Sequence, residues 1–170
     1  MVRGELAAED APVFRAPMRS RDDGVAAGAA VERALTLGVC GVGGRLERVP
    51  SSIREALAAV DARHGERLAR RLERFAAAPD GAFVWTRDAE GLLWLGRLAG
   101  AWRYDPSAAA QAVDLVHVRP CAWGEAPIDA SEVPAAVRAT FARGGRNWQR
   151  VHDSEVSTRS AALWKECAGG

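Results

Sequence analysis

The sequence has few residues that bind metals or form disulfides, and it has no long apolar run. Only three cysteines and three histidines occur in 170 residues, and neither a C-x-x-C pair nor another ligand spacing connects them. No stretch is apolar for the roughly 18 residues of a membrane span. The N-terminal region also lacks the compact apolar stretch of a signal peptide. We therefore expect no metal or other cofactor, no membrane contact, and reduced thiols in a cytoplasmic protein.

Short catalytic motifs are missing as well. No serine lies in a G-x-S-x-G elbow, and no acid-rich loop of a metal site occurs. The stretch "GVGG", residues 41–44, is not followed by the Lys-Ser/Thr of a P-loop, so a structural turn is favoured over a phosphate loop. His117 and His152 are acid–base candidates by residue type, but the apolar run around His117 favours a hydrogen-bonded core position. The sequence predicts a protein that is not an enzyme.

Charge is nearly balanced, and its distribution is more informative than its sum. The formal net charge of +1 does not indicate a partner. Between Glu132 and Asp153, however, no acidic residue occurs. This interval contains Arg138, Arg143, Arg146 and Arg150. A helix dipole explains arginines at a helix C-terminus, but not those beyond Gly144. We therefore expect phosphate contacts from residues 143–150, the basic turn.

The chain divides into four segments by composition and apolar period. Residues 1–30 mix proline, glycine and charge without a period, which predicts a weakly ordered lead-in. The remaining segments are a helical segment packed on a barrel (31–78), a barrel with a C-terminal helix and the basic turn (79–152), and a loose tail (153–170).

Within the helical segment, the best-defined helix begins at Ser52. Ser52 and Glu55 have the spacing of a capping box, and Gly65 indicates either a helical hairpin or one helix broken at that point. The arginines of its second part lie mostly opposite the apolar stripe: Arg67, Arg70, Arg71 and Arg74. A solvated face is the favoured interpretation of these arginines, and nucleic-acid contact is the alternative.

After residue 79 the period changes to that of strands. "AFVWTR" and "LLWLGRLAG" flank a hairpin turn, and "AWRYD" and "DLVHVRPCAW" are two further strands. A second helix is expected over "VPAAVRATFA", with its end near Gly144. Short consecutive antiparallel strands close into a small barrel or a strongly bent sheet. The predicted fold class is α+β: a small, strongly bent antiparallel β-barrel with flanking helices.

The order of these parts resembles the EVE-like domains of the PUA-like superfamily. Such domains occur at the N-terminus of modification-dependent restriction proteins and as free-standing bacterial proteins. The resemblance covers residues 80–151, and its motifs are Leu95–Tyr104 ("LGRLAGAWRY"), His117–Trp123 ("HVRPCAW") and Val133–Arg150. It implies a compact, curved barrel that binds RNA or DNA bearing a modified base, with the nucleotide turned out into an aromatic pocket. It does not imply catalysis.

A protein that reads a base needs aromatic faces for stacking, polar groups for the base edge, and cations for phosphates. Alternation places Trp102 and Tyr104 on one strand face. The predicted base-binding pocket consists of Trp85, Trp102, Tyr104, Asn147 and Trp148. A core position is the alternative for each ring. The predicted phosphate-binding residues are Arg87, Arg103, Arg143, Arg146 and Arg150.

We therefore expect a non-catalytic nucleic-acid binding module whose partner is DNA or RNA with a modified or flipped base. One alternative is a protein-interaction or regulatory module of a bacterial defence system, with residues 52–75 as its surface. Another is a small-molecule sensor or enzyme that uses the same aromatic pocket.

Overall fold

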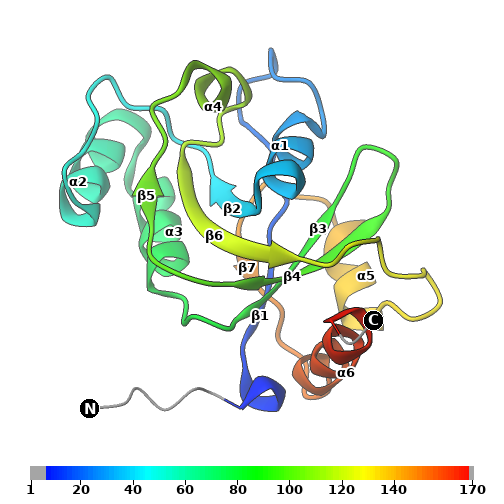
Figure 1. The fold of residues 1–170 in the computed structure, drawn as a ribbon. Helices are drawn as coiled ribbons and strands as arrows, with labels where there is room; N and C mark the ends of the chain where they lie inside the picture. The colour runs from blue at the N-terminus through cyan, green and yellow to red at the C-terminus, as the bar shows by residue number, and fades with distance from the viewer. Residues whose placement is uncertain (1–6, 169–170) are drawn as a thin grey trace.

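The computed structural model describes residues 7–168 and shows one curved sheet between two groups of helices (Figure 1). In spatial order the strands are β2 (Val39–Val42), β6 (His117–Trp123), β4 (Leu93–Leu98), β3 (Phe83–Arg87), β1 (Val13–Arg15) and β7 (Gln149–Arg150), and β5 (Arg103–Tyr104) pairs with β6 off this path. The helices are η1 (Ala8–Asp10), α1 (Ala29–Leu37), α2 (Ile53–His64), α3 (Glu66–Ala77), α4 (Ala108–Val113), α5 (Ala135–Ala142) and α6 (Val156–Ala168). The predicted α+β class is confirmed.

Strand β6 is strongly bent and pairs with three other strands (Figure 1). Its first residues pair with β2 and β5, whereas Cys121–Trp123 pair with β4. The ring of Trp123 lies over Gly96, where an added Cβ would be 2.5 Å from the indole. Glycine is therefore required at position 96, where β4 pairs with the end of β6. The result is an open, curled half-barrel in which β6 bends across the front of the molecule (Figure 1).

The expectation of a weakly ordered lead-in is wrong for the described part of residues 1–30; residues 1–6 lie outside the described residues. Strand β1 runs parallel to β3, with Val13 opposite Phe83, and antiparallel to β7, with Phe14 opposite Arg150. Its three residues are buried. A three-residue strand has too little alternation for a local signal, and its stability comes from two neighbours that are distant in sequence.

The helical segment needs a partial correction, because residues 39–42 form strand β2 at the edge of the sheet. The Ser52 cap is confirmed, since its side chain accepts a hydrogen bond from the Glu55 N–H. The Glu55 carboxylate, however, bonds Ser51 instead of Ser52. Gly65, with φ +99°, separates α2 from α3. The open choice is thereby settled in favour of two helices that pack together.

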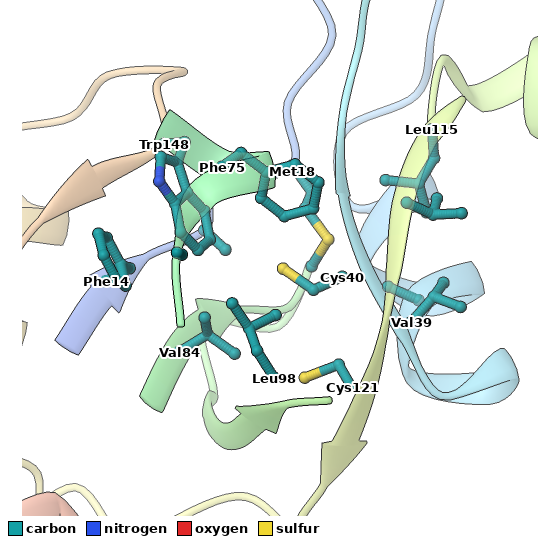
Figure 2. Packing of buried hydrophobic residues seen from close by; sticks show 14 of the residues in the cluster. Phe14, Met18, Val39, Cys40, Phe75, Val84, Leu98, Leu115, Cys121 and Trp148 are labelled. Carbon is teal, nitrogen blue, oxygen red and sulfur yellow. The ribbon is translucent and has the colours of Figure 1, made fainter. Parts of the chain in front are cut away.

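Two apolar clusters lie on opposite faces of the sheet. The first packs α1, α2 and α3 against the sheet, and Figure 2 shows part of it around Phe75, Leu98 and Trp148. The second packs α5 and α6 against β3 and β4. The tail is therefore not loose: Trp164 of α6 meets Phe83 edge-on, with ring centroids 6.4 Å apart. In the described part of the chain, no helix is long and apolar enough to cross a membrane.

Candidate nucleic-acid interface

A pocket of about 290 Å³ lies where the segment after β1, the loop after β2, helix α3 and the basic turn meet. We call it the turn pocket. It is lined by residues 16–22, 41–45 and 146–148, and by His64, Leu68, Arg71 and Asp114. Its volume is at the lower end of the roughly 300–1,000 Å³ of ligand sites. The fold thus brings the "GVGG" loop and the basic turn to one pocket, although about a hundred residues separate them in sequence.

Trp148 supplies the aromatic part of the wall. Its ring stacks on Phe14, with centroids 4.6 Å apart and an 18° angle between planes, and it meets Phe75 edge-on at 5.0 Å. Figure 2 shows these three rings together, with Met18 beside them. The indole Nε1 is buried and has no hydrogen-bond partner among residues 7–168. Trp148 is therefore held firmly by its neighbours and retains an unused donor.

The conformation of the basic turn is held by a buried arginine from β1. Arg15 is 5% exposed and donates five hydrogen bonds. The acceptors are the carbonyls of Thr140, Gly144 and Asn147, the Thr140 hydroxyl and the Gln149 side chain. All five acceptors are neutral. The pKa of Arg15 is lowered mainly by burial, and to a smaller extent by repulsion from the charge of Arg143. Arg15 forms no ion pair with a described carboxylate, so its positive charge lies uncompensated beneath the turn.

The glycine loop on the opposite wall is held through a histidine. His117 has no exposed surface, and burial lowers its pKa to about 4, so the ring is neutral at pH 7. Its Nδ1 accepts from the Trp102 indole at 3.2 Å, which leaves the proton on Nε2 to bond the Gly44 carbonyl at 2.9 Å. The core interpretation of His117 is confirmed. Residues 41–44 thus form a strand end and a fixed turn.

Five arginines line the turn pocket, and they differ in whether a described carboxylate pairs with them: Arg19, Arg21, Arg45, Arg71 and Arg146. Arg45 pairs with Asp22 at 2.9 Å and Arg146 with Asp23 at 3.4 Å. By contrast, four arginines near α3 form no ion pair with any described residue: Arg21, Arg67, Arg71 and Arg74. We call these four the α3 arginines. Burial, then the charges of the other three, lowers the pKa of Arg71. Such a group of like charges binds an anion favourably.

Two of the five predicted base-pocket residues, Asn147 and Trp148, line the turn pocket, and the other three rings need correction. Trp85 has no exposed surface, and its indole donates to Ser160 in the second core cluster. Tyr104 is 8% exposed and its hydroxyl bonds Leu46. Trp102 is half-buried against His117. The predicted phosphate-binding residue Arg146 lines the pocket beside Asn147 and Trp148, and all three come from the basic turn.

The predicted phosphate-binding residues are spread over several surfaces. Arg87 lies 5.6 Å from the centre of the Phe141 ring, in a second groove that the turn glycines also line. Arg103 and Arg150 are exposed on β5 and β7, and Arg143 is exposed at the end of α5. None of these four lines the turn pocket. Sequence reasoning favoured a solvated face for α3, although the spacing of Arg67, Arg71 and Arg74 at i, i+4 and i+7 is a signal for one face.

Comparisons with known proteins give no family: no protein-family model matches the chain, and no curated protein matches it. The described residues also contain no group of three or more histidine, cysteine and acidic side chains that would hold a metal ion. The interpretation of the site therefore depends on its own geometry.

Proposed function

We propose that this protein is a non-catalytic nucleic-acid binding module of the EVE-like kind, and that the turn pocket receives a single base turned out of its stack. The observation that carries the proposal is that two of the α3 arginines, Arg21 and Arg71, line the same pocket as Trp148 and Asn147. Besides burial, the charges of the other two also act on Arg71 and lower its pKa. A base needs a confined site with polar groups, and the phosphates beside it need cations that no acid neutralises.

The wall of the pocket matches the parts of a nucleotide. Met18, Val42 and Leu68 provide apolar surface that suits a ring or a methyl group. The Asn147 side chain forms no hydrogen bond with a described residue, so its amide is available to a base edge. Unstacking a base costs a few kcal/mol. Contacts inside the pocket and phosphate contacts along α3 offset this cost.

Binding to short oligonucleotides tests the proposal. The panel contains DNA and RNA, single-stranded and duplex, with one central cytosine or adenine that is unmodified, methylated or hydroxymethylated. We expect binding at low salt and a steep fall in affinity as the salt concentration rises. The reason is that binding releases the cations condensed on the phosphates, and added salt opposes this release. Absence of binding to every oligonucleotide at low salt overturns the proposal.

Two neighbouring arginines provide a matched pair of variants. Arg71 lines the pocket, whereas Arg70 is exposed and bonded to Glu66 one turn earlier. Each change to glutamine removes one charge from α3. We expect Arg71→Gln to weaken binding about tenfold for all sequences and to lower the salt slope by about one, and Arg70→Gln to have little effect. Equal losses in both variants would indicate non-specific attraction instead of a site.

The unpaired arginines also support a second candidate, in which residues 52–75 bind an acidic surface of a protein partner. In that case a stable partner recovered from lysate survives nuclease treatment, and free oligonucleotides do not compete with it. The same variants separate the two candidates. If the partner is a protein, Arg71→Gln weakens the binding of that protein, and changing the central base of an oligonucleotide has no effect.

A further inference from the structure

We infer that the turn pocket selects bases that carry an exocyclic amino group, which are cytosine, adenine and guanine, over thymine and uracil. The selecting residue is Asp114, whose carboxylate lines the pocket. This inference rests on the proposed function, because it names the class of base that the same site accepts.

The position of Asp114 is fixed by the backbone and by two hydrogen bonds. It follows α4 in the left-handed conformation, with φ 51° and ψ 47°. Its Oδ1 accepts from the Gly44 N–H at 3.0 Å, and its Oδ2 accepts from the Ser20 hydroxyl at 2.8 Å. An added Cβ on Gly43 would lie 2.7 Å from Oδ2, so the glycine loop packs directly against the carboxylate. Asp114 therefore cannot turn away from a ligand without breaking these contacts.

These two hydrogen bonds do not use all the acceptor sites of the Asp114 carboxylate. An ionised carboxylate accepts about four hydrogen bonds and donates none. A base edge that faces Asp114 must therefore offer a donor. Cytosine, adenine and guanine offer an amino group, whereas the corresponding edges of thymine and uracil have a ring N–H between two carbonyl oxygens. A carbonyl placed against the carboxylate repels it and loses its own hydration.

The other polar groups of the pocket discriminate less. Asn147 can present either its oxygen or its amide N–H₂ by rotation. The Ser20 hydroxyl already donates to Asp114 and accepts from the Asp22 N–H. Asp22 also lines the pocket, but its carboxylate is exposed and pairs with Arg45. Asp114 is thus the lining carboxylate that has no cationic partner among the described residues.

The test uses single-stranded oligonucleotides that differ only at one central position, with cytosine, adenine, guanine, thymine or uracil there. For the wild-type protein we expect each amino base to bind on the order of tenfold more tightly than thymine and uracil, the effect of one good base contact. The three amino bases are separate arms, so the panel also shows which of them the pocket prefers.

The informative variant is Asp114→Asn. Asparagine tolerates the left-handed backbone, its oxygen can accept from the Gly44 N–H, and its amide can donate to Ser20. The second amide hydrogen then becomes a donor toward a base carbonyl, so we expect the preference against thymine and uracil to disappear or reverse. Asp23→Asn is the control: it removes the same charge from an exposed residue that does not line the turn pocket, and it should leave the preference unchanged.

The outcomes separate the inference from the proposed function. If all five oligonucleotides bind equally well, or if Asp114→Asn keeps the wild-type preference, the inference is wrong while the proposed function stands. If no oligonucleotide binds, the proposed function fails and the inference with it. The wild-type comparison needs no variant, so the inference stays testable even if Asp114→Asn does not fold.

Discussion

Two parts of the molecule contain tryptophan beside arginine, and they differ in how the polar ring atoms are used. Around β5, the Trp102 indole donates to His117, and the Tyr104 hydroxyl bonds both backbone groups of Leu46. Beside the basic turn, the buried Trp148 Nε1 has no partner among the described residues, and its ring lines a pocket. The β5 region is closed packing, whereas the turn region combines a fixed ring with an unused donor.

The two regions differ in whether the polar atoms of their buried rings have hydrogen-bond partners. Tryptophan and tyrosine in cores usually have their polar tips bonded at the edge. A buried tip without a partner is rare and needs an explanation. The arginines also differ in their partners. Arg119 donates hydrogen bonds to the end of α3 and to Asp80, whereas Arg71 has no acidic partner in the part of the chain described here.

The largest expected effect is obtained by removing the buried cation that holds the turn. Arg15→Met leaves the acceptors at Thr140, Gly144 and Gln149 without their donor, so we expect unfolding to become about 3–4 kcal/mol easier. The turn should also move, so binding to oligonucleotides should be lost at temperatures where circular dichroism shows a folded protein. A folded variant that binds like the wild type would show that the turn is not part of the interface.

Acid is expected to act on the β5 region almost as strongly. His117 has an ordinary pKa of 6.5 when unfolded, and burial lowers it to about 4 in the folded protein. Below pH 6.5 the unfolded chain therefore binds a proton that the folded chain excludes. Stability should fall by up to about 1.4 kcal/mol per pH unit until about pH 4, or about 3 kcal/mol in total.

Urea unfolding at a series of pH values measures this effect. His117→Gln should flatten the pH dependence between pH 6.5 and 4, because the group that titrates is gone. His152 is exposed, so His152→Gln is the matched control and should keep the wild-type slope. An unchanged slope in His117→Gln would mean that another group excludes the proton.

Local signals explain which elements could be predicted from the sequence. The cap at Ser52, the break at Gly65 and the strands around the "DAEG" turn are set by neighbouring residues, and the structure has all of them. β1 and β2 are three and four residues long, and they depend on partners far away in the chain. No local pattern indicates such partners, so these strands were missed.

The site shows the same limit. The sequence singles out the basic turn because no acidic residue interrupts its arginines, and the structure places three of its residues in the lining of one pocket. The strand rings were misplaced because alternation shows that Trp102 and Tyr104 share a face but not whether another segment covers that face. Residues 44–46 do so, through His117 and the Tyr104 hydroxyl. Asp114 has no distinguishing spacing at all, since only the fold brings it to Ser20 and Gly44.

The smallest expected effect tests the closed region alone. Tyr104→Phe keeps the ring but removes the hydroxyl that accepts from the Leu46 N–H at 2.9 Å and from Gln111 at 3.0 Å. We expect a loss of about 1 kcal/mol in the free energy of unfolding, the usual value of a hydrogen bond with partners left behind. Because the ring lies outside the turn pocket, oligonucleotide affinity and base preference should stay at wild-type values. Titration calorimetry and thermal unfolding on the same sample measure both quantities. A changed base preference without a change in stability would mean that Tyr104 contacts the base, and that the β5 region, not the turn region, contains the binding site.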